Sequence, residues 1–148
     1  MNIRTTRHVL TGILLAAFVA SLAAIVHGYL AEEFFEDDFT SLAVKTVGQY
    51  AGPLSIVAAA YFADADTRDE RNPSGAGAIA VLFTALWCVF TAGRTVMFIL
   101  SRDETVDVLT KWNTDVVPIT SFLIDGTLAY FFVSAAKTKG QGAARPTG

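Results

Sequence analysis

Five polar or ionisable residues interrupt segments of the chain that are otherwise apolar, and their chemistry is what could give the protein a function. They are Arg94, Asp125, His27, Lys45 and Gln49. The sharpest case is Arg94, in the middle of the run FTAGRTVMFIL. An unpaired charge deep in a membrane costs a few kcal/mol on insertion scales. Because Asp125 supplies an acid in the next apolar segment, the sequence predicts an intramembrane ion pair between Arg94 and Asp125.

Helical rise places these residues at similar depths. Arg94 is six residues from the outer end of its segment and Asp125 is nine residues from the outer end of its own, which correspond to about 9 Å and about 13 Å. His27 lies near the outer end of the first apolar segment, and Lys45 and Gln49 are one turn apart near the outer start of the second. We therefore expect the five residues to gather in the outer half of the membrane.

Such a cluster has three interpretations. The Arg94–Asp125 pair could be an assembly device that fixes one helix against another, since polar contacts hold membrane helices together. It could instead line an outward-open polar cavity in which Arg94 binds an anionic group or Asp125 exchanges a proton or cation, because intramembrane ionisable residues often serve function. In the third interpretation, one of the two charges faces a helix of another protein.

Other chemistry finds little support in the sequence. His8 and His27 are about 28 Å apart along one helix, so they cannot hold one haem together. The stretch AEEFFEDDFTS lacks the ligand spacing and glycine of an EF-hand, which favours a solvated acidic loop over a calcium site. The chain has no GxSxG or HExxH motif and a single cysteine, Cys88. We expect a protein that is not an enzyme, with no catalytic residues, no metal and no cofactor.

Four long apolar segments carry these residues. The composition is 53% hydrophobic and 17% charged with a mean hydropathy of +0.46, which is too apolar for an ordinary soluble domain. About 20 apolar residues are needed to span a membrane, and the segments 9–30, 42–62, 76–100 and 116–136 qualify. The sequence thus predicts a four-helix transmembrane domain over residues 1–136, with polar connections, and a disordered cytoplasmic tail over residues 137–148. The first segment also resembles a signal peptide, but its apolar run is longer than a signal core, so we expect a retained helix.

Basic residues divide unevenly between the two predicted sides of the membrane. Seven lie on one side, namely Arg4, Arg7, Arg68, Arg71, Lys137, Lys139 and Arg145, and three lie on the other, namely Lys45, Arg102 and Lys111. Because basic connections stay in the cytoplasm, we predict that both termini are cytoplasmic. The net charge is only −3, so the sequence gives no general nucleic-acid footprint.

Small residues recur every fourth position along the first segment. They are Gly12, Ala16, Ala20, Ala24 and Gly28. A ridge of this kind lets another helix approach closely. We expect it to pack inside the four-helix bundle, with a contact between protomers as the alternative.

The sequence therefore predicts an all-α integral membrane protein, a bundle of four transmembrane helices with both termini cytoplasmic. The expected location is the cell membrane, as a multi-pass protein of a prokaryotic inner or plasma membrane. We expect a small non-enzymatic subunit that assists or assembles a membrane complex, or that forms a homo-oligomer. Its partners would be the lipid bilayer and other membrane subunits or further copies of itself. The alternative is a transporter or channel-like subunit whose outward-facing cavity is built around Arg94 and Asp125.

Overall fold

The computed structural model is all-α. It describes residues 3–31, 35–63, 75–101 and 105–143, and for residues 63, 101 and 134–143 it describes the backbone alone. The helices are α1 (Ile3–Leu30), α2 (Glu36–Ala63), α3 (Ala76–Ser101), α4 (Val106–Asp115) and α5 (Val117–Ala143). Helix α5 continues to residue 143, through the first part of the tail that the sequence predicts to be disordered from residue 137. Residues 144–148 of that tail lie outside the described residues.

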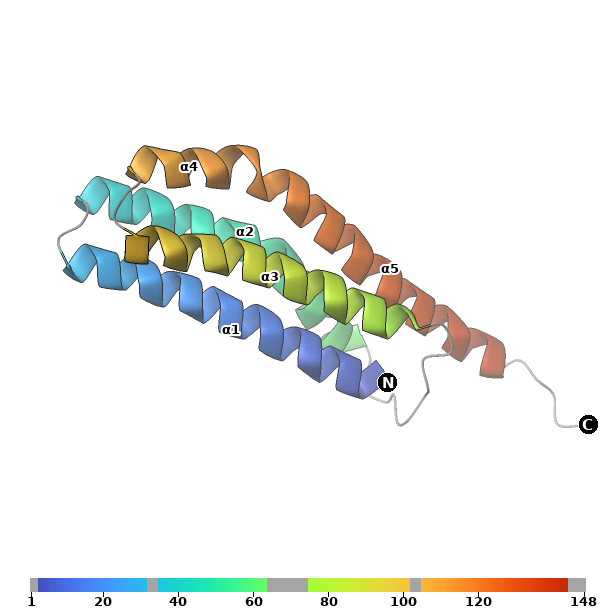
Figure 1. Ribbon diagram of the computed structural model, residues 1–148. Coiled ribbons are helices and arrows are strands. Elements are labelled where there is room, and N and C mark those ends of the chain that lie inside the picture. The colour runs from blue at the N-terminus through green and yellow to red at the C-terminus, as the bar shows by residue number, and fades with distance from the viewer. Residues whose placement is uncertain (1–2, 32–34, 64–74, 102–104, 144–148) are drawn as a thin grey trace, which may run out of the picture.

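The helices lie side by side along one common direction (Figure 1). Helix α1 packs against α2 and α3, helix α5 packs against α2 and α3, and α4 contacts α2 and α5. These contacts close a ring in the order α1, α2, α5, α3. In this ring α1 and α2, and likewise α3 and α5, run in opposite directions, whereas α1 and α3, and α2 and α5, run in the same direction (Figure 1). Opposite directions are expected for successive helices joined by short connections.

Local sequence explains where two of the helices begin. The first turn of α2 carries Glu36, Asp37 and Asp38, and acidic side chains are favourable at the positive end of a helix dipole. Gly75 has a φ of 66° immediately before α3, a conformation that glycine adopts without a steric cost. Its carbonyl oxygen accepts hydrogen bonds from the backbone N–H groups of Ala78 and Ile79.

The connection predicted to be polar between the third and fourth segments contains helix α4. Its sequence VDVLTKWNTD buries Leu109 and Asn113 and exposes Asp107 and Lys111, so it is a short amphipathic helix. Helices α4 and α5 are bent by 40° where they meet. The bend coincides with Pro118, which cannot donate to the carbonyl of Thr114. The fourth helical segment of the structure, formed by α4 and α5 together, thus begins at Val106, ten residues before the predicted start at residue 116.

Membrane-spanning character is strongest in α1 and α3. Within the described residues these two helices are long and apolar enough to cross a membrane, and the bent pair α4–α5 qualifies as a third if it counts as one span. Helix α2, over the predicted segment 42–62, is not among them. Gly48, Gln49 and Pro53 interrupt its apolar sequence. Two or three long apolar helices indicate a membrane protein.

The core is centred on Tyr50 of α2. Its fully buried ring contacts Phe18 of α1 and Trp87 of α3, with centroids 5.6 and 5.2 Å apart. Its hydroxyl lies 3.3 Å from Ser21 Oγ and 3.2 Å from Thr91 Oγ1, both within hydrogen-bonding distance. One side chain therefore links α1, α2 and α3 through both apolar and polar contacts.

Trp87 extends this linkage to α5. Its indole Nε1–H donates a hydrogen bond of 3.2 Å to Thr120 Oγ1. This bond places the middle of α3 level with the first turn of α5. Because the two helices run in opposite directions (Figure 1), it also fixes the level of every later residue of α5 relative to α3.

Replacing Tyr50 with phenylalanine tests this linkage. Tyr50→Phe keeps the ring but removes the hydroxyl between Ser21 and Thr91, and we expect the free energy of unfolding in detergent to fall by about 1 kcal/mol. The matched control is Tyr130→Phe on the exposed face of α5, which should leave stability unchanged. Equal stability of the two variants by thermal or denaturant unfolding would contradict this role of the Tyr50 hydroxyl.

Candidate functional site

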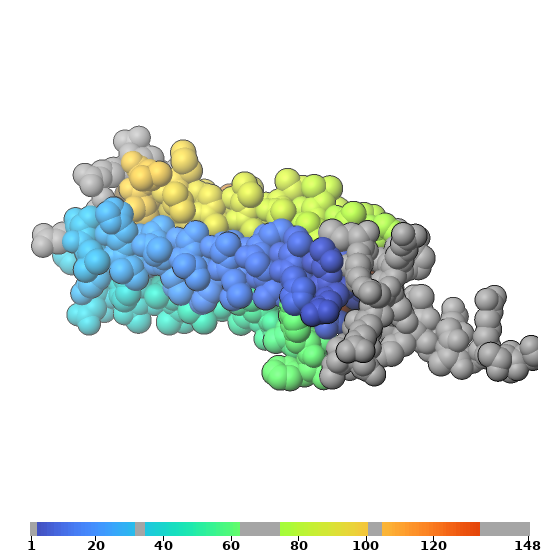
Figure 2. Space-filling view, turned by 90° about the horizontal axis from the view of Figure 1, so that it is seen from below, coloured from blue at the N-terminus to red at the C-terminus, as the bar shows by residue number. Residues whose placement is uncertain are grey.

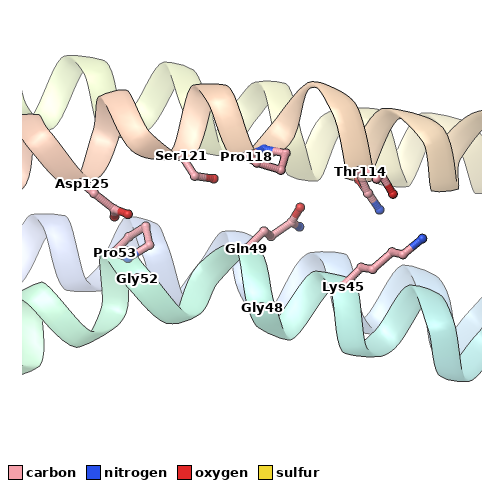
Figure 3. A pocket seen from close by; sticks show the side chains of 10 residues that line it. Lys45, Gly48, Gln49, Gly52, Pro53, Thr114, Pro118, Ser121 and Asp125 are labelled. Carbon is pink, nitrogen blue, oxygen red and sulfur yellow. The ribbon is translucent and has the colours of Figure 1, made fainter.

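A cleft lies between α2 and the bent pair α4–α5, with a volume of about 430 Å³ (Figure 3). We call it the α2–α5 cleft. It is lined by Lys45, Gly48, Gln49, Gly52 and Pro53 from α2, and by Asn113, Thr114, Pro118, Ser121 and Asp125 from α4 and α5. The volume falls in the range of small-molecule sites, roughly 300 to 1,000 Å³.

Helix α2 forms its wall of the cleft from small and kinking residues. Gly48 and Gly52 are one turn apart and carry no side chain, which leaves room between the helices. Pro53 has no backbone N–H, so the carbonyl of Gln49 lacks its usual helical donor. In an apolar environment such a carbonyl needs another donor. The α2 wall is therefore open and carries one additional hydrogen-bond acceptor, the carbonyl of Gln49.

The opposite wall has a related construction. Pro118 leaves the carbonyl of Thr114 without its helical donor, as Pro53 does for Gln49. Ser121 and Asp125 follow at helical spacing from Pro118, so they lie on the same face of α5. Figure 3 shows Asp125 at one end of the cleft, Ser121 and Gln49 in the middle, and Lys45 at the other end.

The carboxylate of Asp125 lies directly against the backbone of Gly52. A Cβ atom at position 52 would be 2.7 Å from Asp125 Oδ2 and 3.1 Å from Oδ1. Real Cβ atoms essentially never approach another heavy atom as closely as the first of these distances. Asp125 can therefore occupy this position only because residue 52 is glycine.

Several polar atoms in the cleft are buried without a hydrogen-bond partner among the described residues. They are Gln49 Oε1 and Nε2, Asn113 Nδ2, Ser121 Oγ and Asp125 Oδ1. Buried polar atoms are normally hydrogen-bonded, and each one left unsatisfied costs about 1 to 3 kcal/mol. Five such atoms on four residues of one cleft indicate a place that water or a ligand completes.

The cleft opens sideways. Its rim residues Gly48, Thr114 and Pro118 are exposed, whereas Asn113 and Pro53 are buried. The remaining polar lining is half-buried. An occupant could therefore enter between α2 and α5 and place a polar group against the inner wall.

The structure brings three of the five predicted site residues together. Lys45, Gln49 and Asp125 line the same cleft. His27 is exposed at the end of α1, outside the cleft. Arg94 is half-buried near α4, where its guanidinium carbon lies 5.8 Å from the centre of the Trp112 ring.

The structure does not bring Arg94 and Asp125 together, which corrects the predicted pairing. The hydrogen bond from Trp87 to Thr120 places Trp87 and Thr120 at the same level along the bundle. Arg94 is seven residues beyond Trp87 in one direction and Asp125 is five residues beyond Thr120 in the other. Twelve residues of helical rise amount to about 18 Å, far beyond the reach of an arginine side chain. The predicted pair depended on starting the fourth helical segment at residue 116, without helix α4.

Sequence reasoning missed other parts of the site. Ser121, Asn113 and Thr114 are not among the predicted site residues, and Asn113 and Thr114 fall in a connection predicted to be polar. The signal that could have found them is the amphipathic pattern of 106–115, which places Asn113 on the same face as Leu109. Gly52 carries no sequence signal of its own, because its role depends on which residue of another helix lies opposite.

Neither a metal cluster nor a known relative explains this site. In the described part of the chain, no group of three or more His, Cys, Asp or Glu residues could hold a metal ion. Comparisons with protein-family models, curated proteins and solved structures find no match. Asp125 is the one carboxylate among the described residues that line the cleft.

Adding a methyl group at position 52 tests the close contact with Asp125. We expect Gly52→Ala to displace the carboxylate and to lower the free energy of unfolding by about 1 kcal/mol through overpacking. The matched control is Gly48→Ala, because a Cβ there meets nothing within 4 Å. The double variant Gly52→Ala/Asp125→Ala should recover the loss caused by the clash. Additive effects of the two substitutions in thermal unfolding would contradict a direct contact.

Proposed function

We propose that this chain is a small non-enzymatic membrane protein that works as a subunit of a membrane assembly, with a second copy of the same chain as its partner. The observation that carries the proposal is the orientation of the small residues of α1. Gly12, Ala16 and Ala20 are exposed, whereas Ala24 is half-buried and Gly28 is buried. We expected the whole ridge to pack inside the bundle, but only its last two residues, Ala24 and Gly28, face other helices of the same chain.

The exposed part of the ridge has the properties of a helix-contact surface. Figure 2 shows α1 lying across one face of the molecule between α2 and α3, and none of the described helices lies over it. A Cβ atom at Gly12 would meet nothing within 4 Å. Small residues four apart allow two membrane helices to approach closely. The exposed α1 residues from Gly12 to Val26 are all uncharged, so an identical face can pair with them across a two-fold axis.

A membrane setting is supported by the rest of the surface. Large apolar side chains are exposed along the rods, for example Leu86 and Val89 on α3 and Phe122 and Tyr130 on α5. Such a surface suits lipid and would be a liability in water. We propose that α1, α2, α3 and the α4–α5 pair cross the membrane as a four-helix bundle. The distribution of basic residues supports cytoplasmic termini and a cell-membrane location.

Cysteine labelling tests this topology. Cys88, which is buried, is replaced with alanine so that the chain has no native thiol. Single cysteines are then introduced at two exposed positions, Thr5 and Glu36. We expect a membrane-impermeant maleimide to label Glu36→Cys in intact cells, and Thr5→Cys only after permeabilisation. Labelling of both sites in intact cells would overturn the proposed orientation.

Enlarging the exposed ridge tests the assembly. We expect Ala16→Leu to raise the dissociation constant of the dimer about tenfold or more, because the added side chain separates the two backbones. Ala129→Leu is the matched control, since Ala129 is an exposed alanine of α5. Sedimentation or native mass measurement in detergent gives the oligomeric state. A monomeric wild-type chain, or equal effects of the two substitutions, would refute self-association through α1.

A second candidate function is that of a transporter or channel-like subunit, and the α2–α5 cleft favours it. The polar residues that support this candidate are now Lys45, Gln49, Ser121 and Asp125, without Arg94. The two candidates use different surfaces of the molecule. A role of the cleft in transport does not require the α1 ridge, whereas a role in assembly through α1 does not require Asp125.

A further inference from the structure

Among the described residues, no cationic side chain lies beside the Asp125 carboxylate in the cleft. Among the described residues that line the cleft, Lys45 is the one cationic side chain. Lys45 is seven residues from Gly52 on α2, which corresponds to about 10 Å of helical rise. Figure 3 shows its side chain pointing away from Asp125, toward the opposite end of the cleft. Long lysine side chains commonly extend toward the membrane interface in this way.

In the part of the chain that the structure describes, the cleft around Asp125 holds unpartnered hydrogen-bond acceptors, beside the unpartnered amide donors Gln49 Nε2 and Asn113 Nδ2. Gln49 Oε1, Ser121 Oγ and Asp125 Oδ1 are buried and unpartnered among the described residues. Pro53 also leaves the carbonyl of Gln49 without its helical donor. A carboxylate with the acceptors Gln49 Oε1 and Ser121 Oγ beside it is complemented by a group with one positive charge and several N–H donors. A primary ammonium group has three donors and no acceptor.

Other ligand classes fit less well. A quaternary ammonium group is usually held by aromatic side chains, and the described lining contains none. A divalent metal ion would be matched by more than one carboxylate, but the lining has only Asp125. An anion would be repelled by Asp125. A bare monovalent ion would leave most of the volume of about 430 Å³ without an occupant.

We propose that the α2–α5 cleft binds a small amphiphilic primary amine, with the ammonium group against Asp125, Gln49 and Ser121. Asp125 compensates the charge, and Gln49 and Ser121 accept N–H donors. The apolar part of the bound amine extends toward lipid through the lateral opening at Gly48 and Pro118, which are both exposed. This site goes beyond the proposed assembly through α1, because it uses another face of the molecule.

Binding of hexylammonium to the purified full-length chain in neutral detergent tests the proposal. Titration calorimetry at constant ionic strength should detect saturable binding of hexylammonium chloride, but not of 1-hexanol or additional sodium chloride. Asp125→Asn should weaken hexylammonium binding about ten- to hundredfold, since it removes a charge-assisted contact. The matched control is Asp107→Asn, which changes an exposed carboxylate of α4 and should bind as the wild type does.

Ser121→Ala provides a second variant if Asp125→Asn does not fold. Ser121 Oγ has no hydrogen-bond partner among the described residues, so its removal should not destabilise the chain, yet it should weaken amine binding several-fold. Equal binding of hexanol and hexylammonium, or undiminished binding by Asp125→Asn or Ser121→Ala, would overturn the proposal. The titration is repeated with Ala16→Leu. Amine binding by that variant would separate the site from assembly through α1.

Discussion

The hydroxyl and ring of Tyr50 hold α1, α2 and α3 at fixed levels, and the geometry of the rest of the molecule follows from that constraint. Apolar burial does little to bring helices together in lipid, so polar contacts and close packing must set their register. The Tyr50 hydroxyl lies within hydrogen-bonding distance of Ser21 and Thr91. The hydrogen bond from Trp87 to Thr120 then fixes the register of α5 against α3. A shift of α5 by one turn, about 5.4 Å, would remove Asp125 from its place beside Gly52.

The α2–α5 cleft can be understood as a consequence of broken helices. Pro53 and Pro118 each interrupt the hydrogen bonding of one wall, and Gly48 and Gly52 leave space between the walls. A cleft of this kind is unfavourable for stability, because it leaves polar atoms of Gln49, Ser121 and Asp125 unsatisfied. Polar groups inside apolar segments tend to mark functional sites for this reason. The α1 ridge, by contrast, is a regular helix surface and suits a partner helix.

Sequence reasoning worked best where one helix alone decides the outcome. The apolar runs in 9–30 and 76–100 lie within α1 and α3, both long and apolar enough to cross a membrane. Helix α4 was missed because an amphipathic stretch of ten residues resembles a polar connection when only apolar runs are sought. That omission moved Asp125 toward the outer end of its helix and created the apparent pair with Arg94. Lys45, Gln49 and Asp125 were nevertheless identified as notable, because each is conspicuous within its own segment.

The sequence by itself determined the all-α class, the apolar character of the long helices and the polar residues that interrupt them. These properties depend on composition and on spacing along one chain segment. Only the tertiary structure decided that Asp125 faces Gly52 rather than Arg94, and that Gly12, Ala16 and Ala20 are exposed. The physical reason is that such contacts depend on the register and rotation of one helix against another. Both are fixed by side chains such as Tyr50 and Trp87, whose partners lie on other helices and are far away in sequence.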